Sequence, residues 1–194
     1  MASRWSQAAT ILPPTLKVCG KTLLPFCLRH RVALEAIGSP VLETEKEMTA
    51  EHMVAAVRIL SSHDFKSLRD KPTWREMYWV SRLTFSKTAL REEMAKLATY
   101  LNEQSLWPRF WVKDGNENKT SSFPWPLAVV ASLTRNGCSL NESWTMPESE
   151  AVWLHIAHCS ASGADVTIVT DKEWEAMEDY KRQTAAQHQT PNRN

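Results

Sequence analysis

The last third of the chain carries the densest set of start and stop signals for secondary structure, and these signals limit how it can fold. Thr145 and Glu148 have the spacing of a capping box, and Pro147 stands in the first turn of the helix that they would begin. Gly163 follows where such a helix would end. The sequence therefore predicts a helix that starts near residue 146 and stops at Gly163.

Two short segments have the character of strands. Residues 166–169 (Val-Thr-Ile-Val) are rich in β-branched side chains, and a second capping-box spacing begins directly after them at Thr170. Near the other end of the chain, residues 16–18 and 22–24 flank Gly20, which can adopt the positive φ angle of a tight turn. We expect a small N-terminal hairpin and one C-terminal strand followed by a helix.

Helical periodicity and capping residues account for most of the remaining chain. They predict helices over residues 26–37 (stopped by Gly38), over 50–62 (capped by Thr49), after Thr73, after Ser86, and over 127–135. The predicted fold is therefore mainly α, a single compact helical domain with a small β component.

The polar and irregular stretches suggest the limits of this domain. Residues 1–15 are expected to be a flexible leader, residues 16–183 the helical domain, and residues 184–194 a disordered polar tail. Within the domain, residues 107–126 combine Trp-Pro and Phe-Pro pairs with a polar run, which is typical of a long loop or insertion.

Composition excludes several classes of function. The 23 basic and 22 acidic residues give no net field that would attract nucleic acid, and no apolar run reaches the roughly 20 residues that cross a bilayer. The four cysteines form no Cys-x-x-Cys pair, and the N-terminus lacks a secretory signal. We expect a cytoplasmic protein with reduced thiols and with neither a nucleic-acid nor a membrane partner.

One cluster has the chemistry of a metal site. His155, His158 and Cys159 would share one face of a helix, but no second pair of ligands completes the set. Packed histidines at the edge of the core are the better interpretation, so the sequence predicts no metal, no cofactor and no enzyme. The segment 29–31 (Arg-His-Arg) is likewise interpreted as a solvated helix edge.

Apolar side chains suggest a surface for another protein. Leu90, Met94, Leu97 and Leu101 form an amphipathic stripe, which is either a core face or one wall of a groove for a partner's helix. The chain has nine tryptophans, residues that serve most often in cores and also at interface centres. The candidate partner-binding residues are the four stripe residues together with Trp107 and Trp111.

Several segments together, covering about half of the chain, resemble a known family. The matching pieces are Val18-Cys-Gly-Lys21, Leu24-Pro-Phe26, the segment 30–40 (HRVALEAIGSP), Glu142-Ser-Trp144 with Met146-Pro147, Glu150-Ala151 and Trp153, the segment 163–168, and the segment 170–173. They resemble small proteins encoded in tailed-phage structural gene clusters, upstream of the tape-measure protein, that are described as tail assembly chaperones or minor tail proteins.

The resemblance implies a non-enzymatic role in the cytoplasm of a bacterial host. Chaperones of this kind bind the long helical tape-measure protein and shield its apolar surface before the tail tube polymerises. The resemblance is also compatible with a structural head-to-tail or minor tail component, and self-association stays open. A metal-dependent enzyme centred on His155 and His158 is the third alternative.

Overall fold

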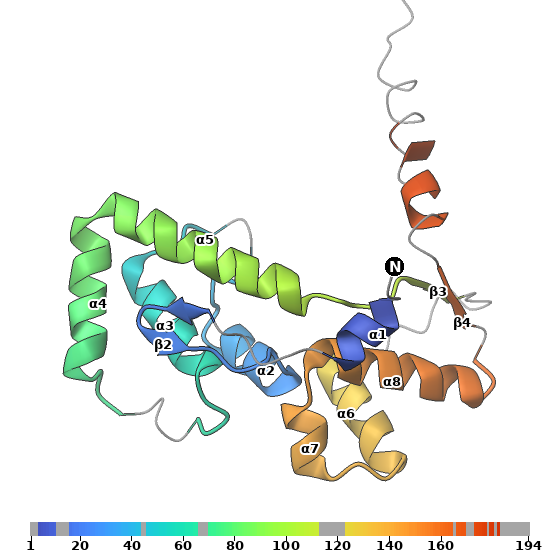
Figure 1. Ribbon diagram of the computed structural model, residues 1–194. Coiled ribbons are helices and arrows are strands. Elements are labelled where there is room, and N and C mark those ends of the chain that lie inside the picture. Colours follow the sequence, from blue (N-terminus) through green and yellow to red (C-terminus); the bar gives the residue numbers. More distant parts are fainter. Residues whose placement is uncertain are drawn as a thin grey trace, which may run out of the picture.

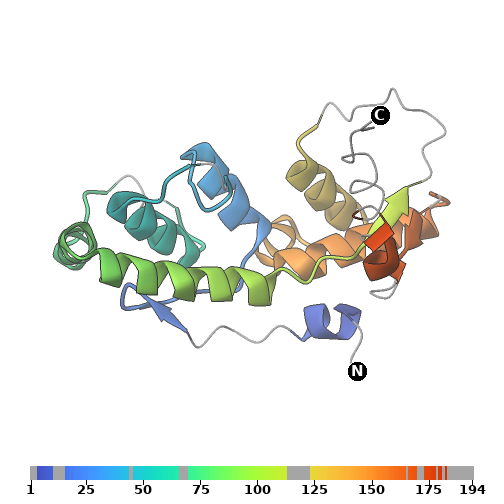
Figure 2. The same cartoon turned by 90° about the horizontal axis from the view of Figure 1, so that it is seen from above.

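The computed structural model describes residues 4–10, 16–43, 46–65, 70–112, 123–164, 166–169, 173–177, 179–180 and 182. These residues are mainly helical, with two small antiparallel sheets of two strands each. The predicted fold class, mainly α with a small β component, is confirmed. The helices form two neighbouring groups, and the long helix α5 (Lys87–Gln104) runs along the first group toward the second (Figures 1 and 2).

The first group surrounds the larger hydrophobic core. It contains β1 (Lys17–Val18), β2 (Lys21–Thr22), α2 (Leu28–Ala36), α3 (Ala50–Leu60), α4 (Trp74–Phe85) and α5. The central helix is α3, which buries seven of its eleven residues. The hairpin β1–β2 is held against α5, because the backbone N–H of Cys19 donates to the Glu93 carboxylate over 2.7 Å and the Tyr100 hydroxyl donates to the Leu24 carbonyl over 2.7 Å.

The second group consists of α6 (Trp125–Arg135), α7 (Leu140–Thr145) and α8 (Glu148–Ala161). Its smaller core is shared with Leu28 of α2, so the two cores meet at the start of that helix. The first residues of α8 join the second group to the first, since the Glu148 N–H donates to the Phe26 carbonyl over 2.7 Å and the Ser149 hydroxyl donates to the Gln104 carbonyl over 2.5 Å.

Most of the predicted helix boundaries are confirmed. Thr49 accepts a hydrogen bond from the N–H of His52 and so caps α3, and Thr73 and Glu76 form the predicted capping box of α4. The predicted turn glycine Gly20 has φ +72° and lies against the Trp79 indole, so a side chain there would meet both a strained backbone and the Trp79 ring.

Two predictions at the ends of elements are wrong. Thr145 does not cap α8, because it is the last residue of α7 and its hydroxyl donates to the Asn141 carbonyl over 2.9 Å. The expected leader, residues 1–15, contains helix α1 (Arg4–Ala9), which packs against α8 through the fully buried Ala8 and through Trp5.

Part of the expected loop 107–126 is a strand. Residues Phe110–Val112 form β3, which pairs antiparallel with the predicted strand β4 (Val166–Ile168). The pairing is long-range, so local sequence gives little sign of it. Several other expected features lie outside the described residues. They are the polar residues 113–122 of the expected loop, the cap at Thr170, the expected tail 184–194, and residues 1–3 and 11–15 of the expected leader.

Candidate protein-binding groove

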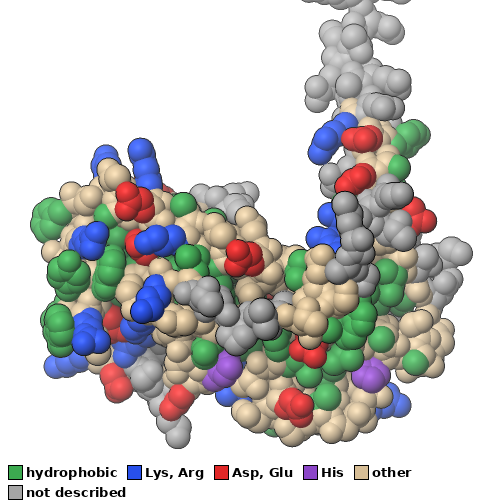
Figure 3. Space-filling view, viewed as in Figure 1, with side chains coloured by type: hydrophobic (Ala, Val, Ile, Leu, Met, Phe, Trp, Pro, Cys, Tyr) green, Lys and Arg blue, Asp and Glu red, His purple; other side chains and the backbone are tan. Residues whose placement is uncertain are grey.

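Helix α4 presents large apolar side chains to solvent. Only Glu76 and Leu83 of its twelve residues are buried. Trp74, Met77 and Phe85 are 70%, 58% and 88% exposed. Figure 3 shows apolar side chains gathered at the end of the molecule that α4 forms, next to several Lys and Arg side chains. Contiguous exposed apolar surface of this kind commonly marks a binding site.

A groove of about 620 Å³ runs between α3 and α4. Val54 and Ile59 of α3 are buried at its base, while Met77 and Phe85 of α4 stand exposed at its edge. Its other lining residues are Ile37, Glu51, Ala55, Arg58, Pro72, Glu76, Val80, Ser81 and Thr84. Because α4 has twelve residues and a helix rises 1.5 Å per residue, the groove has a wall of about 18 Å, the length of roughly three helical turns.

The wall of the groove is positioned by one buried carboxylate. Glu76 accepts from the N–H of Thr73 over 2.8 Å and from Lys21 Nζ over 2.9 Å, and Arg58 Nε of α3 lies 3.7 Å away. Glu76 thus fastens the start of α4 to the hairpin and to α3. Burial opposes ionisation, but the hydrogen bonds from Lys21 and Thr73 prevail and lower the pKa of Glu76 from 4.5 to about 2.

Replacing Glu76 with glutamine is therefore expected to weaken the fold in a pH-dependent way. A folded-state pKa below the unfolded one means that the ionised carboxylate stabilises the fold above about pH 4.5, and that this contribution is lost as the pH falls toward 2. We expect Glu76→Gln to lower the free energy of unfolding at pH 7 by about 2 to 3 kcal/mol.

Urea unfolding followed by circular dichroism between pH 2 and pH 7 measures this difference. It should shrink steadily below pH 4.5. The control Glu92→Gln, at an exposed position on α5, should be neutral throughout. A difference for Glu76→Gln that is the same at pH 2.5 and pH 7 would contradict the assigned role of Glu76.

The predicted stripe on α5 is mostly turned toward the core. Leu97 is 3% exposed, and Leu90 and Leu101 are half-buried against the same core, while Met94 is 37% exposed. The buried face of α5 consists of residues 89, 93, 97, 100 and 104. Leu97 is the one stripe residue on this face, and the other three stripe residues lie beside it. Leu97 is therefore a core residue, and the stripe offers little free surface to a partner.

The two tryptophans of the predicted set lie away from the α3–α4 groove. Trp107 is half-buried and packs edge-on against Trp125, with ring centroids 5.0 Å apart. Trp111 lies in strand β3, and its side chain is outside the described part of the structure. The structure thus does not bring Trp107 to the surface that α4 exposes.

Tryptophans lie both at the edges of the cores and at the surface, and Trp79 and Trp144 pack against the larger and the smaller core. None of the eight tryptophans whose side chains are described is fully buried. Trp107 and Trp125 instead stack around a cation: the Arg31 guanidinium carbon lies 5.4 Å and 5.2 Å from their ring centroids and 5.5 Å from that of Phe26. In this part of the molecule the tryptophans cover the contact between the two helix groups.

The same arginine forms an ion pair with Glu148 at the contact between the two helix groups. Arg31 Nε donates to the buried carboxylate of Glu148, and Arg31 Nη2 donates to its second oxygen over 3.2 Å. Burial raises the pKa of Glu148, and the hydrogen bond and charge of Arg31 oppose the rise. The segment 29–31 is therefore not a solvated helix edge, since Arg31 reaches α8 and His30 is fully buried.

The cluster at the end of α8 does not assemble a metal site. His155 and Cys159 are half-buried, with Cys159 Sγ 3.7 Å from His155 Nε2. Among the described residues, one group of at least three His, Cys, Asp or Glu side chains lies closely enough together to hold an ion, namely Cys27, His30 and His63. The sequence alone gives no sign that His63 lies beside the other two.

Comparisons with protein-family models, with curated proteins and with solved structures find no match to this chain. In the described part of the chain, no helix has both the length and the apolar character to cross a membrane. The geometry of the chain's own surface is therefore the basis for any functional conclusion.

Proposed function

We propose that this protein is a non-enzymatic assembly factor that binds an amphipathic helix of another protein in the groove between α3 and α4. The observation that carries the proposal is the pair of exposed side chains Met77 and Phe85, which stand about two helical turns apart along a buried apolar base. A partner helix with apolar residues at i, i+3, i+4 and i+7 would cover this surface and complete a three-helix packing with α3 and α4.

The polar lining favours a helix over a small polar ligand. The buried polar side chain of the groove is Glu76, and its oxygens are already engaged by Lys21, Arg58 and the Thr73 N–H. A site for a polar small molecule needs converging groups that orient it. An apolar helix face makes no such demand, and Met77 supplies a flexible, polarisable contact that adapts to it.

The resemblance to phage tail assembly chaperones supplies the biological setting of the proposal. In this setting the partner is the tape-measure protein, a long helical protein whose apolar faces need cover before the tail tube assembles around it, and the site of action is the cytoplasm of the bacterial host. The alternative in the same setting is a minor tail component that stays in the finished particle.

Co-expression with the protein encoded downstream tests the function. We expect the partner to remain soluble only when this protein is present, the two to co-elute in size exclusion, and assembled particles to lack this protein. A partner that stays insoluble and never co-elutes, together with a fixed number of copies of this protein in each finished particle, would contradict the chaperone function and support the structural one.

A further inference from the structure

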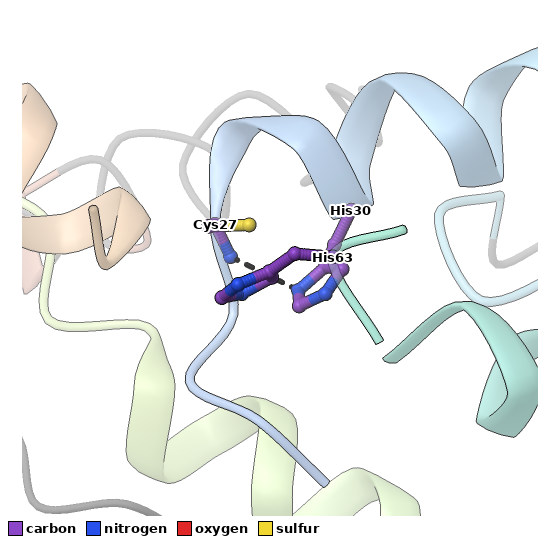
Figure 4. Close-up of side chains that lie close together, drawn as sticks. All are labelled: Cys27, His30 and His63. Atoms are coloured by element: carbon purple, nitrogen blue, oxygen red, sulfur yellow. Dashed lines mark hydrogen bonds between the residues drawn. The ribbon is translucent and has the colours of Figure 1, made fainter. Parts of the chain in front are cut away.

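Three side chains with metal-ligand chemistry meet where α2 begins and α3 ends (Figure 4). Cys27 is the N-cap residue of α2, and His30 lies three residues further on in its first turn. His63 follows the C-cap of α3, Ser61, by two residues. Cys27 and His30 are fully buried, and His63 is half-buried. The ligand atoms of all three lie within 4.8 Å of one another.

These separations are close to those of a tetrahedral zinc site. With zinc–sulfur bonds of about 2.3 Å and zinc–nitrogen bonds of about 2.0 Å, neighbouring ligand atoms are roughly 3.3 to 3.6 Å apart. Ligand atoms within 4.8 Å therefore need a closure of about 1 Å, which side-chain rotation can supply. One thiolate and two imidazoles are a combination that favours zinc over magnesium or calcium.

The hydrogen bonds leave ligand atoms available in the centre of the cluster. The Nε2 of His63 is buried and has no hydrogen-bond partner among the described residues. His30 Nε2 lies 3.1 Å from the Ser62 carbonyl, which fixes the ring and makes Nδ1 the nitrogen with a free lone pair. That nitrogen accepts a long contact of 3.4 Å from the Cys27 N–H.

Protonation of the cluster is compatible with a metal and unsuited to a nucleophile. Burial lowers the pKa of His30 to about 4 and lowers the pKa of His63, so both imidazoles are neutral near pH 7, the form that binds metals. Burial also raises the pKa of the Cys27 thiol to about 11. A fully buried thiol of this kind is a poor nucleophile, whereas a metal ion can replace its proton.

We propose that Cys27, His30 and His63 bind one zinc ion through Sγ, Nδ1 and Nε2, with a water molecule as the fourth ligand. Binding releases the Cys27 thiol proton to solvent and leaves both histidines neutral. The ion would fasten the start of α2 to the end of α3, the helix that forms the base of the groove. The site is independent of the proposed partner binding.

Zinc content is the direct test, measured by mass spectrometry on full-length protein purified without an affinity tag and equilibrated with micromolar free zinc. We expect about one zinc per chain in the wild type. Cobalt(II) in place of zinc should give a thiolate-to-cobalt charge-transfer band and the intense visible bands of tetrahedral coordination.

Variants locate the site. His63→Ala removes a half-buried ligand outside any helix and should leave the fold intact while zinc affinity falls by at least about 100-fold. Cys27→Ser should remove the charge-transfer band. The control carries His155→Gln and Cys159→Ser together and should retain both zinc and the band. A wild type without bound zinc, zinc that persists undiminished in His63→Ala, or zinc that disappears in the control would each overturn the proposal.

Discussion

Replacing Leu97 with glutamate is expected to unfold the protein. Leu97 is 3% exposed in the larger core, where a carboxylate would be surrounded by apolar side chains. An unpaired buried charge together with the lost packing costs about 3 to 5 kcal/mol, a large part of the 5 to 15 kcal/mol that usually stabilises a domain. Thermal unfolding followed by far-UV circular dichroism should show a transition lowered by roughly 6 to 20 °C, or none at all.

Met94→Glu is the matched control on the same helix. Met94 lies one turn before Leu97 and is 37% exposed, so its replacement should change the stability by less than about 1 kcal/mol. If Leu97→Glu kept the wild-type transition and lost only the partner, the α5 stripe would be a binding surface and the structural placement of Leu97 would be wrong.

The double variant Met77→Lys/Phe85→Lys is expected to lose the partner and keep the fold. Both side chains are more than half exposed, at 58% and 88%, so lysine is tolerated in the unbound protein. In the complex each ammonium group would have to be desolvated against an apolar helix face. Loss of two apolar anchors should weaken binding by at least about 100-fold, measured by calorimetry with the purified partner.

Leu140→Lys provides the control for this prediction. Leu140 begins α7, is 60% exposed and does not line the groove. Its replacement introduces a lysine at an exposed apolar position outside the groove, so binding should be unchanged. Equal losses of affinity in both variants would indicate nonspecific hydrophobic association instead of a defined groove.

The sequence predicts elements well where the signals are local. Thr49, Thr73 and Ser86 cap the helices that they were expected to cap, because each hydroxyl needs only an N–H three residues away. The hairpin around Gly20 is equally local. These signals are sufficient for the fold class and for most element boundaries.

The sequence predictions of element boundaries fail where a residue far away in the chain binds a side chain or strand to which the local pattern gives another role. Glu148 has the position of a capping-box acid, but its carboxylate is bound by Arg31, which is 117 residues away in the chain. β3 likewise depends on β4, which lies more than 50 residues later. No local pattern could indicate these partners.

The candidate sites differ in how far the sequence could reveal them. Apolar residues around the whole circumference of residues 74–85 were a signal that some of them would be exposed, although the sequence alone cannot say that Met77 and Phe85 would border a groove. The pair Cys27 and His30 has ligand spacing, but only the folded chain brings His63 to it. The regular stripe on α5 was more conspicuous, and regularity is typical of a core face.

The methionine methyl groups offer the most direct test of the groove as the binding surface. The chain has seven methionines, and two of them, Met77 in the groove and Met94 on the α5 stripe, are exposed reporters of the two candidate surfaces. In a spectrum of carbon-13-labelled methionine methyl groups, assigned with single Met→Leu variants, titration with the partner helix should shift or broaden the Met77 signal and leave the Met94 signal unchanged. A shift of Met94 with Met77 unchanged would contradict the groove and return the binding surface to α5.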